Sequence, residues 1–238
     1  MASRRNVVTQ WPPDNNLWAA LAGTLCRTRA HFAGMRRITS WDELRSRVGE
    51  PKAILCLGNG PSSEGTGIES AGFDCLFRVN WIWSDRSIHR DPNVVFTADL
   101  DAPPGPAVPI VCFPTRQDAN LILESYARRR IATRTEYLVF PELASPFSDR
   151  TWSHRPTNGA LMVAAAALLR PARLIIAGID LYLHPDGKYP GATDEPNEYD
   201  AMHDRNIDLA FIRVVLDRFG GDIDIRSQQL RTALAAGR

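Results

Sequence analysis

Cysteine is scarce in this chain and is not arranged as a metal or disulfide motif. The four cysteines among 238 residues, Cys26, Cys56, Cys75 and Cys112, show no C-x-x-C spacing and mostly lie in apolar, strand-like segments. Zinc sites and disulfide scaffolds require closely spaced or numerous cysteines. We therefore interpret these residues as buried thiols of a protein in a reducing compartment.

The chain also lacks an excess of charge of either sign. It carries 28 Lys and Arg against 27 Asp and Glu, a net charge of +1. A general attraction to nucleic acid or to an anionic membrane is therefore not expected, because both need a basic excess.

Long hydrophobic runs are missing as well. The longest apolar run is Ala160–Leu169, about half of the roughly 20 residues that a membrane-spanning helix needs. Met1–Arg5 is followed by polar residues and not by the apolar segment of a signal peptide. We expect a cytoplasmic protein, and leave open a peripheral contact with the inner face of the membrane through tryptophans such as Trp11, Trp18 and Trp41.

Two regions differ in pattern. Residues 1–50 are predicted to form an N-terminal arm with two helices, one from Asn15 to about Ala33 and a short one starting at Ser40. The short helix is marked by a capping box, Ser40-Trp41-Asp42-Glu43. Residues 51–238, with 44% hydrophobic residues in the chain as a whole, are expected to form one domain around a single core.

In residues 51–238, short apolar runs alternate with helical patterns. The predicted strands are Ala53–Leu57, Asp74–Phe77, Val94–Thr97, Val108–Phe113, Tyr137–Phe140, Arg173–Ala177 and Asp222–Ile225. The predicted helices are Gln117–Arg130, Gly159–Arg170 and about Met202–Phe219. This alternation predicts an α/β fold with a mostly parallel, Rossmann-like sheet and helices on both faces.

A glycine-rich turn follows the first of these strands. It consists of Gly58, Asn59, Gly60, Pro61 and Ser62. Glycines allow close approach of the backbone, and free amides at such a turn can bind an anion. The turn matches neither G-x-G-x-x-G nor a P-loop, so a dinucleotide or ATP site finds little support, and a plain tight turn is the alternative.

Polar residues follow other predicted strands. Asn80 comes after the second strand, and Asp180 ends the Gly178-Ile179-Asp180 segment after Arg173–Ala177. Ligands of open α/β sheets bind beyond the carboxyl ends of the strands. Both side chains are therefore candidates for substrate binding, although Asn80 alone is also typical of a turn.

The start of the buried helix is a second candidate for anion binding. Thr157, Asn158 and Gly159 precede its apolar run, and the unpaired amides and dipole of a helix N-terminus favour a phosphate. Ordinary N-capping by Thr157 or Asn158 is the competing interpretation.

Asp99 and Asp101 form an Asp-x-Asp pair after the third strand. Such pairs hold divalent ions in many nucleotide-sugar transferases, but Asp-x-Asp is also frequent by chance. We predict that Asp99 binds substrate and that the pair holds no metal, although metal binding by Asp99 and Asp101 stays an open alternative.

Three further residues could take part in catalysis. Tyr182 and Tyr189 flank a loop, and their hydroxyls could stabilise a departing phosphate; loop packing is the alternative. His203 lies near the start of an amphipathic helix beside acidic residues, and histidine is suited to general-base work.

In this order the segments resemble the bacterial sialyltransferases that use CMP-activated sialic acid, with a weaker similarity to the sialyl motifs of the animal enzymes. The matching segments are Ile54 to Ser62, Phe77 to Asn80, Pro156 to Tyr182, and His203 with Asn206 and Asp208.

The resemblance implies that CMP lies between the glycine turn, Asn80 and the helix start at Thr157. Tyr182 and Tyr189 would then bind the leaving phosphate, and His203 would take the proton of the acceptor hydroxyl, giving inversion without a metal or other cofactor. The partners implied are a CMP-activated sugar and a glycan acceptor. A homo-oligomer, the acceptor, the linkage and the particular nonulosonic or ulosonic acid stay open.

Two alternative functions remain open. One is an ATP- and magnesium-dependent, pyrophosphokinase-like enzyme that shares the Gly-Asn-Gly-Pro-Ser turn. The other is a nucleotide-binding protein without catalysis.

Overall fold

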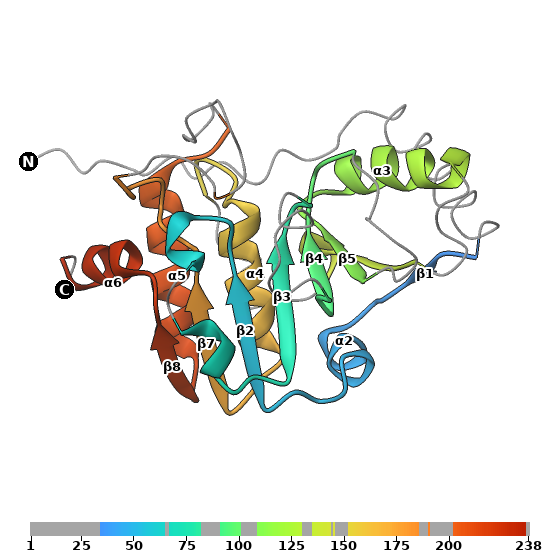
Figure 1. Cartoon of the computed structure of the whole chain (residues 1–238). Coiled ribbons are helices and arrows are strands. Elements are labelled where there is room, and N and C mark those ends of the chain that lie inside the picture. Colours follow the sequence, from blue (N-terminus) through green and yellow to red (C-terminus); the bar gives the residue numbers. More distant parts are fainter. Residues whose placement is uncertain are drawn as a thin grey trace, which may run out of the picture.

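The computed structural model describes residues 34–64, 67–81, 91–100, 109–129, 135–143, 145, 152–185, 190 and 202–236. These residues contain one eight-stranded sheet in the order β1-β6-β5-β4-β3-β2-β7-β8, and every neighbouring pair is parallel (Figure 1). The strands are β1 (Arg36–Arg37), β2 (Ala53–Leu57), β3 (Cys75–Val79), β4 (Val94–Phe96), β5 (Ile110–Phe113), β6 (Glu136–Val139), β7 (Arg173–Ala177) and β8 (Asp222–Ile225).

In the described part of the chain, five α-helices connect or flank these strands: α2 (Trp41–Arg47), α3 (Arg116–Arg129), α4 (Asn158–Leu168), α5 (Arg205–Arg218) and α6 (Gln228–Ala235). The predicted parallel α/β fold is thus confirmed. Three of the seven predicted strands have the predicted bounds, and the other four differ by one or two residues at one or both ends. The sequence did not predict β1 or α6.

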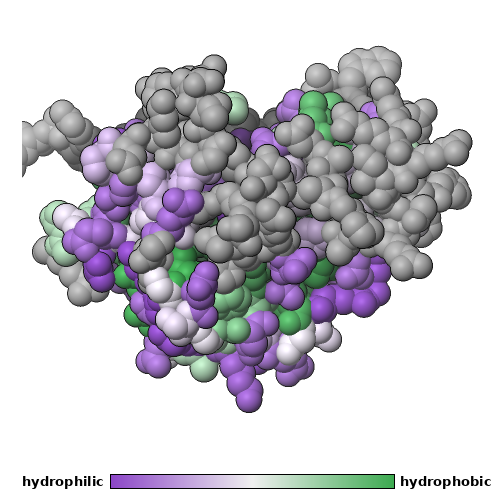
Figure 2. All heavy atoms as spheres, viewed as in Figure 1, coloured by the Kyte–Doolittle hydropathy of each residue, from purple (hydrophilic) through white to green (hydrophobic). Residues whose placement is uncertain are grey.

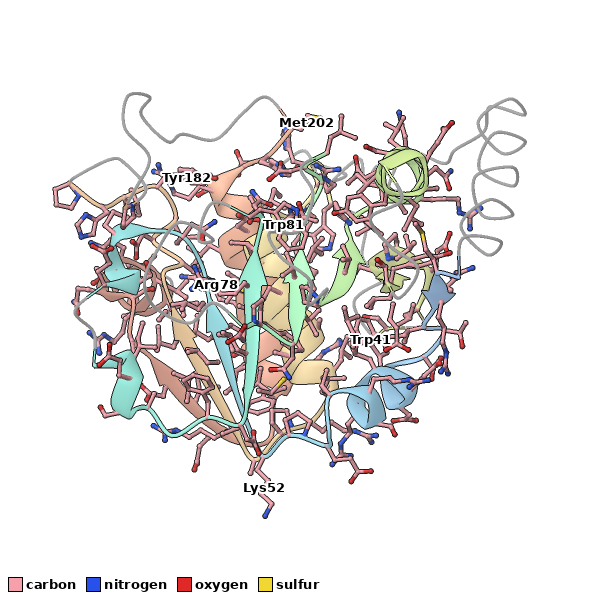
Figure 3. All side chains as sticks on the ribbon, turned by 45° about the vertical axis from the view of Figure 1, so that its right-hand side comes forward. Trp41, Lys52, Arg78, Trp81, Tyr182 and Met202 are labelled. Atoms are coloured by element: carbon pink, nitrogen blue, oxygen red, sulfur yellow. The ribbon has the colours of Figure 1, made fainter. Side chains whose placement is uncertain are left out.

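The order in which strands are added to the sheet switches sides between β2 and β7, although all the strands are parallel. From β2 the strands run outward through β3 to β6 on one side, and β7 and β8 lie on the other. In open α/β sheets such a switch point leaves a crevice at the carboxyl ends of the strands. Figure 3 shows Tyr182 and Met202 at that end of the molecule and Lys52, which precedes β2, at the opposite end.

The described part of the first 50 residues belongs to the same sheet and core. β1 pairs with β6, and Ile38, Leu44 and Val48 are buried in the main core cluster. The described residues between Gly34 and Glu50 thus pack into the same core as the rest of the described chain, and the division at residue 50 stays a prediction. The helix predicted for Asn15 to Ala33 lies outside the described residues.

The predicted capping box at α2 forms in a modified way. Ser40 Oγ accepts a hydrogen bond from the Glu43 amide at 3.1 Å, as expected of an N-cap. The Glu43 carboxylate, however, accepts from the Thr39 amide at 2.9 Å, one residue before the position that the motif predicts.

Alternate residues of each strand face two different layers of helices. Ile54 and Cys56 of β2 pack in the cluster that contains α4 and α5, whereas Leu55 and Leu57 pack against the short 3-10 helix η2 (Ile68–Ser70) on the other face. The period of two along a strand produces this separation. Helix α3 packs over β5 and β6 through a cluster of its own, so helices cover both faces of the sheet.

Helix α4 is the buried core helix that its composition predicts. Every residue from Ala160 to Ala166 is buried, and the helix contacts four strands as well as α5. Leu161, Met162 and Val163 each contribute about 1.5–3 kcal/mol by burial. The alanines between them let the helix lie close to its neighbours, so its amino end is held firmly at the carboxyl edge of the sheet.

The cysteines in the described residues are free and buried. They are Cys56, Cys75 and Cys112, as the sequence predicts, while Cys26 lies outside the described residues. Burial raises the pKa of Cys75 to about 12 and raises the pKa of Cys56 and Cys112 well above the usual value. These thiols are packing residues.

Within the described ranges, none of the helices combines the length and the apolar character needed to cross a membrane. On the face shown in Figure 2, hydrophilic and hydrophobic residues are interspersed below the grey atoms.

Candidate functional site

A cavity of about 370 Å³ lies at the carboxyl ends of β2, β3, β4 and β7, beside the starts of α4 and α5. Its size suits a small ligand. Of the predicted site residues, twelve line it: Gly58, Asn59, Gly60, Pro61, Asn80, Asp99, Thr157, Asn158, Gly159, Asp180, Tyr182 and His203. Ser62 lies just behind the lining, and Tyr189 lies outside the described residues.

The glycine turn after β2 is shaped by its contact with the turn after β7. A Cβ atom on Gly58 would lie 2.2 Å from the carbonyl oxygen of Gly178, and one on Gly60 would lie 2.4 Å from Asp180 Oδ2. Only glycine fits this approach of two backbones.

The expectation that the amides of this turn are free to bind an anion is wrong for most of them. The Gly58 amide donates to the Ala177 carbonyl at 2.8 Å, and the Gly60 amide donates to the Gly178 carbonyl at 2.9 Å. The Ser62 amide donates to Asp180 Oδ2 at 2.9 Å. The last residue of β7 and the turn that follows it satisfy these donors, so the glycine turn forms a wall of the cavity.

Asp180 is consequently a structural residue as well as part of the lining. Its carboxylate accepts from both the amide and the hydroxyl of Ser62, and it is 5% exposed. Ser62 Oγ also lies 2.9 Å from Ser227 Oγ, which accepts from the Ile179 amide. This network joins the turns after β2, β7 and β8.

Asn59 is engaged in a similar way at the end of β3. Its Nδ2 donates to the Val79 carbonyl at 2.9 Å, and its Oδ1 accepts from Arg78 at 3.3 Å. Arg78 is fully buried within β3, near Trp81 in Figure 3. We did not single out Arg78 from the sequence, although a charged residue inside an apolar strand was the signal that could have found it.

Two asparagines meet across the cavity floor. Asn158 Nδ2 donates to Asn80 Oδ1 at 3.2 Å, which joins the end of β3 to the first residue of α4. Asn80 has a φ of 52°, a left-handed conformation that asparagine tolerates better than most residues.

The start of α4 is capped from within the protein. Thr157 Oγ1 accepts from the Ala160 amide at 3.4 Å, so the N-capping predicted as one alternative is present. Thr157 in turn donates to Asp208 of α5, from its amide at 2.8 Å and from its hydroxyl at 2.7 Å. Asn158 and Gly159 occupy the first two helical positions, where backbone amides have no acceptor within the helix, and both residues line the cavity.

His203 is oriented by a backbone carbonyl. Its Nδ1 lies 2.7 Å from the carbonyl oxygen of Arg155. Because a carbonyl only accepts, Nδ1 carries the proton, and in the neutral ring Nε2 keeps its lone pair. The ring is thereby prepared to accept a proton at Nε2.

Arg155 also lines the cavity and was not predicted. Its guanidinium donates to Asp118 of α3 at 3.1 Å, and its side chain is 19% exposed. Nothing in the neighbouring sequence marks the role of this residue, because that role comes from the contact of its carbonyl with a histidine 48 positions later.

Tyr182 follows β7 in a strained turn. Leu181 and Tyr182 both have positive φ values, 51° and 53°, which side-chain-bearing residues rarely adopt. Both line the cavity, as does His184. Such backbone strain is often found at functional sites.

Asp99 lines the cavity, and its amide donates to Thr97 Oγ1 at 2.9 Å. Asp101 lies outside the described residues. Within those residues, no group of three or more His, Cys, Asp or Glu side chains could hold a metal ion. The absence of a metal from the reaction stays an expectation.

The sheet order and the cavity define a Rossmann-like α/β protein with a ligand crevice at the switch point. No protein-family model and no curated protein sequence matches the chain.

Solved structures do share its fold. The chain is similar to the sialyltransferase CstII from Campylobacter jejuni in complex with a substrate analogue, CMP-3FNeuAc, at 16% identity and a TM-score of 0.53, over 74% of this chain and 82% of that chain. A second similar structure is a variant of the sialyltransferase CST-II in complex with CMP, at 16% identity and a TM-score of 0.51, over 73% of this chain and 81% of that one. The fold is therefore sialyltransferase-like.

Proposed function

We propose that this chain is an inverting, metal-independent glycosyltransferase that moves sialic acid or a related nonulosonic or ulosonic acid from a CMP-activated donor to a glycan hydroxyl. One observation carries the proposal: His203, with Nδ1 held by the Arg155 carbonyl, lines the same cavity as the amino end of α4 and Tyr182. A proton acceptor and two groups suited to a phosphate thus lie around one cavity of ligand size.

In the proposed reaction, His203 Nε2 takes the proton of the acceptor hydroxyl while that oxygen bonds to the anomeric carbon. The bond from this carbon to the phosphate oxygen breaks, and CMP leaves with the electron pair. One displacement inverts the configuration.

The leaving phosphate would be stabilised at the α4 start. The amides of Asn158 and Gly159 and the helix dipole favour a negative charge there, and the Tyr182 hydroxyl would donate a further hydrogen bond. Tyr189 keeps its proposed role in this step. Asn80 and Asp99 are proposed to contact the nucleoside or the donor sugar.

The partners in this proposal are the CMP-activated sugar and a glycan acceptor. A cytoplasmic location, contact with the inner face of the membrane, assembly as a homo-oligomer and the absence of nucleic-acid binding stay predictions.

The first test is ligand binding. CMP should raise the Tm of the wild-type chain more than UMP or GMP at the same concentration, because a bound ligand stabilises the folded state. Equal shifts with all three nucleotides would speak against a cytidine site.

The second test is turnover. Wild-type protein should release CMP from CMP-sialic acid, slowly in water alone and faster with a glycan acceptor, and EDTA should not change the rate. His203→Asn should lower CMP release by about 10²–10⁴-fold and keep CMP binding. His154→Asn is the matched control, since His154 is exposed and is not part of the cavity lining.

Other outcomes would identify the alternatives. Dependence on magnesium and ATP would indicate the pyrophosphokinase-like enzyme. Binding of CMP without turnover of any CMP-activated sugar, in wild type and variant alike, would indicate a non-catalytic nucleotide-binding protein.

A further inference from the structure

The turn that carries Tyr182 needs support from outside itself. Leu181 and Tyr182 are consecutive residues in the left-handed region, which is unfavourable for residues with a Cβ atom. One hydrogen bond closes the turn from within, from the Leu183 amide to the Asp180 carbonyl at 2.9 Å. Such a conformation persists where surrounding contacts fix it.

Arg205 supplies a contact of this kind. It is the first residue of α5, and its Nε donates to the carbonyl oxygen of Leu181 at 3.0 Å. That carbonyl belongs to the peptide group that leads into Tyr182. Because the guanidinium is planar and its donors have fixed directions, the bond fixes the orientation of this peptide group as well as its position.

The same helix start holds His203. Asp204, between the two residues, caps α5 by accepting from the amides of Asn206 at 2.7 Å and Ile207 at 3.1 Å. A capped helix start is a firm base from which Arg205 reaches the turn after β7. Arg205 therefore links the start of α5, directly after the proposed proton acceptor His203, to the turn that contains Tyr182.

We infer that Arg205 is a positioning residue, which holds the Leu181–Tyr182 peptide so that the Tyr182 hydroxyl meets the departing phosphate at a fixed distance from His203. This inference rests on the proposed function and adds a residue to its machinery. Arg205 acts through Tyr182 and does not itself contact the substrate.

Arg205 is exposed, so its removal should leave the fold intact. Arg205→Ala should lower kcat for CMP release by about 10- to 100-fold, as misplacement of a catalytic group by about 1 Å can do, and should change KM for the donor by less than about threefold. Arg205→Lys keeps a donor on a long side chain but lacks the planar guanidinium, so it should recover only part of the activity that Arg205→Ala loses.

Arg213→Ala is the matched control. Arg213 lies on the same helix and also donates to backbone carbonyls, those of Ala233 at 2.7 Å and Leu234 at 3.4 Å, but it does not line the cavity. Its removal should lower the Tm at least as much as that of Arg205 and leave kcat within about twofold of wild type.

A double-mutant cycle with Tyr182→Phe separates positioning from a general structural role. If Arg205 acts through the Tyr182 hydroxyl, Arg205→Ala should cost less than about threefold in the Tyr182→Phe background. Losses that multiply in the double variant, or full activity of Arg205→Ala, would overturn the inference while leaving the proposed function standing. A wild-type chain that neither binds CMP nor releases it from a donor would overturn both.

Discussion

Asp208 accepts two hydrogen bonds from Thr157, one from its amide at 2.8 Å and one from its hydroxyl at 2.7 Å, although 51 residues separate them. Asp208 is 2% exposed and lies in the first turns of α5, while Thr157 is the N-cap of α4. One carboxylate thus fixes the helix start at which we propose that phosphate binds. It also joins that start to the helix that follows His203.

Replacing this carboxylate should weaken both stability and ligand binding. Asp208→Asn turns one acceptor oxygen into a donor, which then faces a donor of Thr157 in a buried site. We expect the free energy of unfolding to fall by about 1–3 kcal/mol, and the Kd for CMP to rise, because the α4 start is less firmly held. Urea denaturation and calorimetric titration measure the two effects. Asp217→Asn, at an exposed position of the same helix, should have the stability and the CMP affinity of wild type. If Asp208→Asn and Asp217→Asn show the same stability and the same Kd, Asp208 does not hold the start of α4.

Close packing of two turns should make Gly58 intolerant of any side chain. In Gly58→Ala the new Cβ would lie 2.2 Å from the Gly178 carbonyl oxygen, so β2 and β7 would have to separate. We expect a loss of about 3 kcal/mol in the free energy of unfolding, or failure to fold. Gly220→Ala is the control, because its Cβ meets nothing within 4 Å, and it should change stability by less than about 0.5 kcal/mol. If thermal denaturation finds Gly58→Ala and Gly220→Ala equally stable, the contact between the two turns does not exclude a side chain at position 58.

Asp74 should make stability depend on pH in the acid range. Partial burial raises the pKa of its carboxyl, but the amides of Lys52 and Ala53, each donating at 2.9 Å, outweigh this effect and hold the pKa below its ordinary value of 3.8. The folded pKa is therefore lower than the unfolded one. The resulting stabilisation is present above the unfolded pKa and is lost as the pH falls through the folded pKa.

The comparison with Asp74→Asn tests this sign. Urea denaturation from pH 7 down to about pH 3 should show wild type more stable than the variant, by a margin that is constant at the upper end and shrinks below about pH 4. A margin that does not change with pH would contradict the assignment.

The buried thiols should be unreactive in the folded protein. Burial raises the pKa of Cys75 to about 12 and that of Cys56 and Cys112 well above the usual value, so little thiolate forms at pH 8 and the reagent has no access. Iodoacetamide should modify these three residues only after unfolding in guanidinium, as peptide mass mapping would show. Rapid modification of any of them in the native chain would contradict the core assignment.

The local parts of the fold could be predicted because their signals are local. The apolar runs Ala53–Leu57 and Arg173–Ala177 have the bounds of β2 and β7, since each run is buried on both faces of a parallel sheet. β1, with two arginines, shows no such run, and its place in the sheet comes from its pairing with β6 about 100 residues later.

Most candidate site residues were also found from the sequence, because side chains that follow parallel strands and begin helices meet at one edge of a sheet. Their partners were not found. Arg155 and Arg205 lie beside or within segments that were singled out, but neither was chosen, because each acts through a backbone contact with a residue distant in the chain. The amides of the glycine turn were expected to be free.

Local sequence patterns were enough to locate seven of the eight strands and four of the five α-helices in the described residues, together with the polar residues at their ends, because periodicity, capping and turn chemistry act between close neighbours. Long-range packing sets the other features. It places β7 beside β2, so that Ala177 and the turn after β7 accept hydrogen bonds from the amides of the glycine turn. It also brings the Arg155 carbonyl to His203, where it sets the tautomer, and Asp208 to the start of α4. Each of these depends on residues about 50 to 120 positions apart in the chain, whose meeting is set by how the helices and strands pack.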